Sequence, residues 1–188
     1  MIKIGITGSL ASGKTTASKI LSHRRGPLFS ADKAVKELYF NKNFKSLIAR
    51  RFKMKKRNNM KKSLKKLIIQ NNRNIYKLEK IIHPLVRKKM RSFTSQYRNK
   101  RLLFYEIPLL IENKLMKYFN AVIFIKAKKK IRLKRFQLKR GDKKLFNLLN
   151  NKQMIDTKKI KFCDHVVVNE KNLSILKKNL SAIMGKYE

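Results

Sequence analysis

The chain has 188 residues, of which 43% are hydrophobic, so it can bury one sizeable core and is expected to form a single domain with one helical excursion. Its 50 Lys and Arg outnumber its 10 Asp and Glu, and the formal charge of +40 would attract nucleic acids, acidic membranes or anionic small molecules. The single cysteine, Cys163, excludes an intramolecular disulfide and a multi-cysteine metal site, and it is interpreted as a small buried hydrophobe.

The charge by itself does not assign a partner. Lysine is spread over the whole chain beside abundant Asn and Ile, a composition that an AT-rich genome also produces, and the basic blocks are not interleaved with aromatics at a regular spacing. No apolar run reaches the length of a membrane span. We therefore expect a cytoplasmic monomer with no membrane partner and no specific nucleic-acid partner.

Strands and helices are predicted to alternate along the chain. In order, they are a strand at 2–7, a helix at 14–24, a strand at 27–30, a helical stretch over 33–98, strands at 102–107 and 121–126, helical segments at 129–140 and 143–162, a strand at 165–169 and a helix at 172–184. Apolar strands separated by helices are typical of a parallel sheet covered on both faces. The sequence therefore predicts a three-layer α/β fold with a parallel five-stranded sheet and a helical insertion.

A glycine-framed loop follows the first strand. Residues 8–15, GSLASGKT, match the pattern G-x-x-x-x-G-K-[ST] between a strand and a helix, where backbone N–H groups and the helix N-terminus can hold phosphate. Lys14 would bridge the terminal phosphates and Thr15 would offer its hydroxyl to Mg²⁺. The alternative is a chance match in a turn. The predicted nucleotide-binding residues on this loop are Gly8, Ser9, Leu10, Ala11, Ser12, Gly13, Lys14, Thr15 and Thr16.

Two carboxylates follow predicted strands. Asp32 comes after the second strand, at the sheet edge where ligands bind in open parallel sheets, and is a candidate base for a substrate hydroxyl. Its alternative role is the N-cap of the next helix. Glu106 ends the third strand, where an acid would support Mg²⁺, and its alternative is an ordinary exposed strand end. Because no guanine-binding signature of the NKxD kind is present, a small kinase is favoured over a GTPase.

Five motifs in order, GSLASGKT, SADKAV, IIHPLV, EIPLLIE and the run from QMIDTKK to CDHVVVN, resemble the dephospho-CoA kinase family over residues 2–169. The resemblance implies transfer of the γ-phosphoryl group of ATP, with Mg²⁺, to the ribose 3′-hydroxyl of dephospho-CoA, with Asp32 accepting the proton. It also implies three parts, which are a P-loop core (1–32, 100–127 and 163–188), a helical substrate-binding region (33–99) and a lid (128–162).

The resemblance implies further site residues. His83, Pro108 and Leu109 would shape the substrate pocket, although His83 is equally well read as a helix-boundary residue set by Pro84. An Arg of the lid would lie over the ATP phosphates; Arg140 is the expected residue and Arg135 its nearest competitor, while without the resemblance this basic run reads as a solvated face. The remaining residue implied is Asn169, which would lie by the adenine of ATP.

Three positions depart from the family pattern. Ser9 stands where Gly is usual, Ser30 replaces the first acid of an Asp-x-Asp pair, and Lys36 stands where Arg is common. Two other classes of protein stay open on the sequence. One is a different P-loop kinase that acts on a nucleoside, nucleotide or shikimate-like acceptor, and the other is an RNA-associated P-loop enzyme.

Overall fold

The computed structural model describes residues 1–54, 60–71 and 73–188. The chain divides into two compact units, the first made of Met1–Ser30 and Tyr97–Glu188 and the second of Ala31–Gln96. The first unit contains all the strands of the described residues, and the second contains helices. The segment expected to form a lid, 128–162, belongs to the first unit, and its action as a lid stays a prediction.

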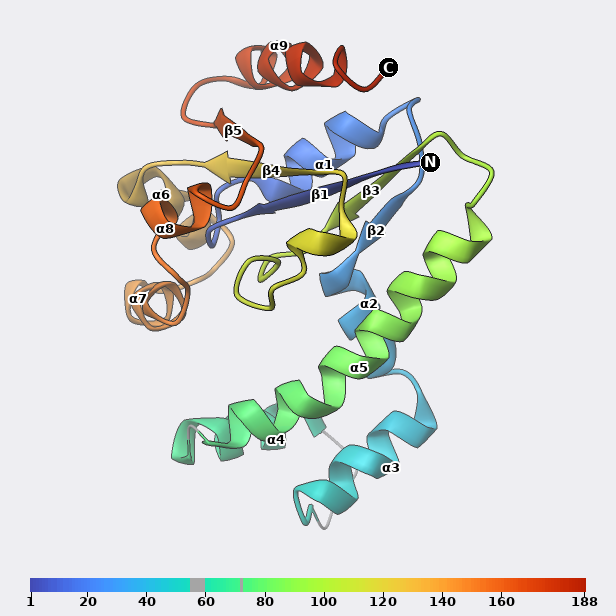
Figure 1. Ribbon diagram of the computed structural model, residues 1–188. Coiled ribbons are helices and arrows are strands. Elements are labelled where there is room, and N and C mark those ends of the chain that lie inside the picture. The colour runs from blue at the N-terminus through green and yellow to red at the C-terminus, as the bar shows by residue number, and fades with distance from the viewer. Residues whose placement is uncertain (55–59, 72) are drawn as a thin grey trace. The chain divides into compact units, whose positions relative to one another are not determined.

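The first unit is built on a five-stranded parallel sheet in the order β2-β3-β1-β4-β5 (Figure 1). The strands are β1 (Ile2–Gly8), β2 (Leu28–Ser30), β3 (Leu102–Glu106), β4 (Ala121–Lys126) and β5 (His165–Val168). All five residues of β3 are buried, as expected of a strand covered on both faces. The predicted parallel α/β fold is therefore confirmed.

The register of the sheet brings the carboxyl ends of the strands to one edge. Glu106 pairs with Ile6 of β1 on one side and with Ser30 of β2 on the other, and Gly8 pairs with Ile125 of β4. The residues that follow β1, β2 and β3 therefore start from the same edge of the sheet. Because ligands of open parallel sheets bind at this edge, the register fixes where a site can form.

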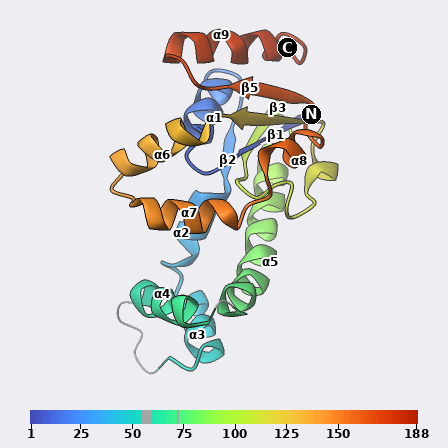
Figure 2. The ribbon, with the colours of Figure 1, turned by 90° about the vertical axis from the view of Figure 1, so that its left-hand side faces the viewer.

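Helices cover the sheet of the first unit. They are α1 (Lys14–Ser22), α6 (Lys129–Leu138), α7 (Lys143–Asn151), α8 (Asp156–Ile160), α9 (Leu173–Met184) and the short 3-10 helix η1 (Met116–Tyr118). Leu21 of α1 and Leu180 of α9 are fully buried in one apolar cluster with Ile4 and Ile123 of the sheet. In Figure 1, α6, α7 and α8 lie on the side toward which β4 runs, and Figure 2 turns that side toward the viewer.

One helical prediction is wrong in its extent. Residues 143–162 were expected to be one helical segment, but α7 ends at Asn151 and α8 begins only at Asp156. The break is made by Ile155, whose extended backbone (φ −64°, ψ 145°) cannot continue a helix. It gives Gln153 and Asp156 the positions from which they contact the glycine loop.

The described residues of the second unit form helices joined by short turns, with no strand among them, as predicted. It contains α2 (Ala31–Leu38), α3 (Lys42–Arg51), α4 (Met60–Gln70) and α5 (Arg73–Gln96). Phe44, Ile48 and Leu64 form the centre of its own apolar cluster, against which Ile81 and Leu85 of α5 pack. The longest helix, α5, is rich in Lys and Arg. Within the described chain we find no helix with the length and apolar character needed to cross a membrane.

Candidate active site

The glycine loop between β1 and α1 has a backbone that requires glycine at both ends. Gly8 and Gly13 have φ values of 152° and 96°. A Cβ on Gly8 would lie 2.4 Å from the carbonyl oxygen of Ile125, and one on Gly13 would lie 2.1 Å from Nδ2 of Asn169. Ser9 is not among the described residues of positive φ, so a side chain is tolerated there without backbone strain. The departure at Ser9 is therefore compatible with the loop.

Inside the loop, two side chains with polar ends are buried. The Lys14 side chain is only 9% exposed, and its Nζ donates to the carbonyl oxygen of Ser9 at 2.9 Å. The Ser12 hydroxyl is buried and has no hydrogen-bond partner among the residues that the structure describes. Thr16 is exposed in the first turn of α1. A buried ammonium and an unsatisfied hydroxyl in a glycine-framed loop are suited to receiving an anion, because an anion would neutralise the charge of the first and accept from the second.

Thr15 and Glu106 meet at the base of the loop. The Thr15 hydroxyl donates to Oε1 of Glu106 at 2.6 Å, and Glu106 is 3% exposed. The interpretation of Glu106 as an exposed strand end is therefore wrong. A hydroxyl and a carboxylate are the hard oxygen ligands that Mg²⁺ prefers, and Mg²⁺ is commonly held by one or two protein oxygens together with substrate phosphates. These two residues fit a magnesium ion.

Helix α6 contacts the loop through two arginines. Arg132 is buried, and its Nη1 donates to the carbonyl oxygen of Leu10 at 3.3 Å. Nη1 of Arg135 donates to the carbonyl oxygens of Ser12, at 3.3 Å, and Asn169, at 3.0 Å. Arg140 is exposed just beyond the end of α6, with a left-handed φ of 63°. Of the two competing arginines, the structure brings Arg135 to the loop, and the role given to Arg140 stays a prediction.

Asn169 follows β5 and is buried against the loop. Its Nδ2 donates to the carbonyl oxygen of Ser12 at 2.8 Å, and its backbone N–H donates to that of Lys126 at 2.8 Å. Asn169 and Arg135 therefore share one acceptor on the loop. The structure brings Asn169 to the glycine loop, and its position beside adenine stays a prediction.

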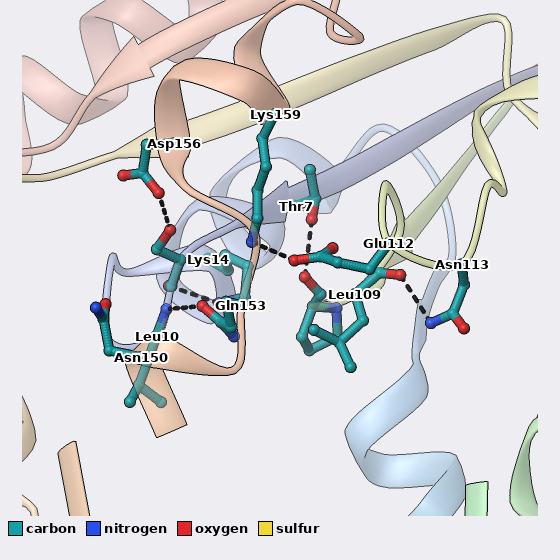
Figure 3. A network of polar contacts seen from close by, with 12 residues as sticks. Thr7, Leu10, Lys14, Leu109, Glu112, Asn113, Asn150, Gln153, Asp156 and Lys159 are labelled. Carbon is teal, nitrogen blue, oxygen red and sulfur yellow. Dashed lines mark hydrogen bonds and ion pairs between the residues drawn. The ribbon is translucent and has the colours of Figure 1, made fainter. Parts of the chain in front are cut away.

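The segment leading into α8 supplies a second set of loop contacts (Figure 3). Oε1 of Gln153 accepts from the backbone N–H of Leu10 at 3.0 Å, and the carboxylate of Asp156 accepts from the Ser9 hydroxyl. Sequence reasoning assigned no role to these two residues or to Arg132. The signal available was the spacing of Gln153, Asp156 and Lys159, which places three polar side chains at intervals of three residues.

The segment after β3 begins with the predicted substrate residues. The carbonyl oxygen of Pro108 accepts from the Thr7 hydroxyl at 3.1 Å, and that of Leu109 accepts from Nδ2 of Asn113 at 2.8 Å. Pro108 and Leu109 are half-buried, whereas Leu110 is fully buried. Their backbone is thus fixed next to the end of β1, and their contact with a substrate stays a prediction.

Asp32 and His83 belong to the second unit. Asp32 is exposed in the first turn of α2, two residues along the chain from the end of β2, and because α2 begins at Ala31 the N-cap interpretation is wrong. His83 lies inside α5, which continues through Pro84, so the helix-boundary interpretation is wrong as well. Burial lowers the pKa of His83, and the nearby Glu79 carboxylate opposes this shift without reversing it. The lowered pKa favours a neutral imidazole near pH 7.

Cys163 has no features of a nucleophile. It is half-buried, and its thiol donates to the carbonyl oxygen of Lys159 at 3.3 Å. Burial, helped by the neighbouring Asp164 carboxylate, raises the pKa of the Cys163 thiol to about 12. The thiol is therefore protonated at neutral pH, in agreement with its interpretation as a packing residue.

A glycine loop at the carboxyl edge of a parallel sheet, with a buried lysine inside it and a Thr–Glu pair beneath it, defines a P-loop kinase fold. Solved structures share this fold, and two of them cover nearly the whole chain. TT1252 from Thermus thermophilus aligns with a TM-score of 0.84 and 24% identity over 100% of this chain and 98% of that one, and the dephospho-CoA kinase from Campylobacter jejuni aligns with a TM-score of 0.69 and 24% identity over 98% and 96%.

The sequence comparisons identify the family within this class. The dephospho-CoA kinase family model matches residues 2–174. The dephospho-CoA kinase of Bartonella quintana is 35% identical over 175 residues, which cover 90% of each chain. The chain belongs to the dephospho-CoA kinase family.

Proposed function

We propose that this chain transfers the γ-phosphoryl group of ATP to the ribose 3′-hydroxyl of dephospho-CoA, giving CoA and ADP. The bond from the γ-phosphorus to the bridging oxygen of ADP breaks, a bond to the 3′-oxygen forms, and the hydroxyl proton passes to Asp32. The observation that carries the proposal is the Thr15–Glu106 pair at 2.6 Å beneath a loop that holds the Lys14 ammonium, in a chain of this family. The cofactors are ATP and Mg²⁺, and the proposed setting is a cytoplasmic monomer.

The loop residues bind and neutralise the nucleotide. Lys14 now donates to the Ser9 carbonyl oxygen and would turn its ammonium to the terminal phosphates, where it stabilises the charge of the transferring group. Thr15 and Glu106 would hold Mg²⁺, which, when bound, neutralises negative charge on the phosphates. Since phosphoryl transfer needs alignment and charge neutralisation more than covalent chemistry, these groups supply most of what the reaction requires.

The acceptor side of the proposal rests on three further assignments. Asp32 is exposed in the first turn of α2, and its carboxylate would accept the 3′-hydroxyl proton. The helical region 33–99, with His83, would receive the CoA portion, and Pro108 and Leu109 are likewise proposed to bind the acceptor. The segment 128–162 would close over the phosphates and exclude water, bringing Arg140 to the nucleotide.

The test is release of ADP by purified protein with Mg·ATP and one acceptor at a time. We expect release with dephospho-CoA, and none above background with a nucleoside, a nucleotide, shikimate or tRNA. Lys14→Ala, prepared in the same way, shows how much release comes from contaminating kinases. The proposal would be refuted if another acceptor stimulated ADP release and dephospho-CoA did not. Stimulation by tRNA would point to the RNA-associated class.

A further inference from the structure

Residues 153–159 contact two separate parts of the first unit (Figure 3). Gln153 and Asp156 bind the glycine loop, through the N–H of Leu10 and the hydroxyl of Ser9. Lys159 instead forms an ion pair with Glu112 in the segment after β3, with 2.6 Å between Nζ and Oε1. One short stretch of chain therefore joins the phosphate-binding loop to the segment that follows β3.

The Lys159–Glu112 pair is closed off from water. The Lys159 side chain is 0% exposed and that of Glu112 is 19% exposed. Neither the Nζ atom nor the carboxylate oxygens has a hydrogen-bond partner among the described residues, so the ion pair is the contact that compensates their burial. A buried pair of this kind adds little net stability, but removal of either partner leaves an uncompensated charge. The pair is therefore better suited to fixing a position than to stabilising the fold.

Glu112 belongs to a stretch, residues 107–115, that is itself firmly folded. Besides the Thr7 contact to Pro108, the N–H of Leu115 donates to the Leu110 carbonyl oxygen at 3.0 Å, and Leu110 is fully buried. The N–H of Ile107 donates to the carbonyl oxygen of Ile6 in β1 at 3.0 Å. Residues 107–115 are therefore held by their own hydrogen bonds and by bonds to β1, and loss of the Lys159 contact would remove one further group that holds them.

The Leu10 N–H now donates to Gln153, although backbone N–H groups of such loops are the donors that phosphate oxygens accept from. A bound nucleotide would compete with Gln153 for this donor, and the change would pass along residues 153–159 to Lys159. We propose that residues 153–159 form a clasp that couples nucleotide binding at the glycine loop to the position of residues 107–115, with Lys159 as a positioning residue.

The value of this coupling for catalysis rests on the proposed function, because Pro108 and Leu109 are the acceptor-side residues of that proposal. The coupling itself needs only a nucleotide in the loop. The clasp can therefore be tested with a non-hydrolysable ATP analogue and Mg²⁺, without any acceptor.

The experiment is hydrogen exchange of the full chain with and without the analogue. In the wild type we expect the exchange rates of amides in residues 107–115 to fall by about threefold or more when the analogue is bound. Lys159→Met should lose this protection. Lys158→Met is the matched control, since Lys158 is the exposed neighbour on the same helix, and it should keep the wild-type response.

Two further variants keep the test decisive if Lys159→Met does not fold, as checked by circular dichroism. Lys159→Arg keeps the charge and should restore the protection, whereas Glu112→Gln removes the partner charge and should abolish it. Protection in Glu112→Gln equal to that of wild type, with the analogue bound in both, overturns the clasp.

Steady-state kinetics separate a positioning role from a general loss of structure. With the clasp broken in Glu112→Gln, KM for ATP should stay within about twofold while kcat for transfer falls and the ratio of ATP hydrolysis to transfer rises severalfold. An unchanged ratio would count against positioning. A wild-type protein that shows analogue-dependent protection but no reaction with dephospho-CoA would refute the proposed function and leave the clasp standing.

Discussion

The Thr15 hydroxyl donates to the Glu106 carboxylate at 2.6 Å, although 91 positions separate the two residues in the chain. Thr15 lies in the first turn of α1 and Glu106 is the last residue of β3, which pairs with β1 in parallel register. The carboxyl end of β3 therefore lies beside the loop that β1 leads into. This juxtaposition places the two oxygen ligands that we assign to Mg²⁺ at one point.

Glu106→Gln tests that assignment. The amide keeps the size of the side chain and accepts from Thr15, but it loses the charge that attracts a divalent cation. We expect the Mg²⁺ concentration at half-maximal activity to rise by about 10-fold or more. Glu188→Gln is the control, because Glu188 forms its ion pair with Arg25 near the C-terminus. Equal Mg²⁺ dependence in the two variants would remove Glu106 from the metal site.

Lys14→Ala removes the ammonium that the loop surrounds. We expect kcat to fall by about 10²–10³-fold, because charge on the transferring phosphoryl group is no longer neutralised. Lys19→Ala, an exposed position on the same helix, should behave as wild type. The measurement is single-turnover transfer at saturating ATP, and a near-normal rate in Lys14→Ala would contradict the phosphate-binding role.

Arg135 and Arg140 should respond differently to truncation. Arg135→Ala loses donors to two carbonyl oxygens, so we expect a loss of about 1–3 kcal/mol in the free energy of unfolding together with weaker nucleotide binding. Arg140→Ala should leave thermal unfolding unchanged and lower kcat, because Arg140 is exposed and would act only over the nucleotide. A normal kcat in Arg140→Ala would transfer the lid role to Arg135.

Asp32→Asn should slow phosphoryl transfer by about 10²-fold or more while ATP affinity is retained, since the amide cannot accept the hydroxyl proton. Glu37→Gln serves as the control on the same helix, where Glu37 pairs with Lys89 at 2.5 Å. Single-turnover rates with nucleotide binding measured in parallel give the answer. An unchanged rate in Asp32→Asn would remove the proton-accepting role.

His83 predicts a pH dependence of stability. Burial lowers its pKa below the ordinary 6.5, so the unfolded state binds this proton more readily than the folded state does. Protonation therefore favours unfolding, and the free energy of unfolding should decrease as pH falls below about 6.5. His83→Gln should flatten this decrease in urea titrations between about pH 7 and pH 5.

The control for this prediction is His23→Gln, at an exposed histidine in the first unit. It should leave the pH profile of the free energy of unfolding as in wild type. A profile that keeps its full slope in His83→Gln would assign the acid sensitivity to other groups.

Local sequence patterns were sufficient to predict the strands and the phosphate-binding loop and to reveal the resemblance to the family. The loop could be predicted because its strand, its glycines and the start of its helix lie within about fifteen consecutive residues, and turn geometry depends on such neighbours. Thr15 and Glu106 could each be predicted as a metal ligand, because the carboxyl ends of parallel strands share an edge. The break at Ile155 was not predicted, since neither a glycine nor a proline marks it in residues 143–162.

Contacts between distant segments were decided only by the tertiary structure. The Lys14–Ser9 bond joins residues five positions apart, but Ser9 and Asp156 are 147 positions apart and Leu10 and Gln153 are 143 apart. The sequence did not separate Arg135, whose guanidinium contacts the loop, from Arg140, which is exposed beyond the end of α6. Which side chains meet across distant segments depends on packing and burial in the folded chain. The order of residues within one segment does not determine these contacts.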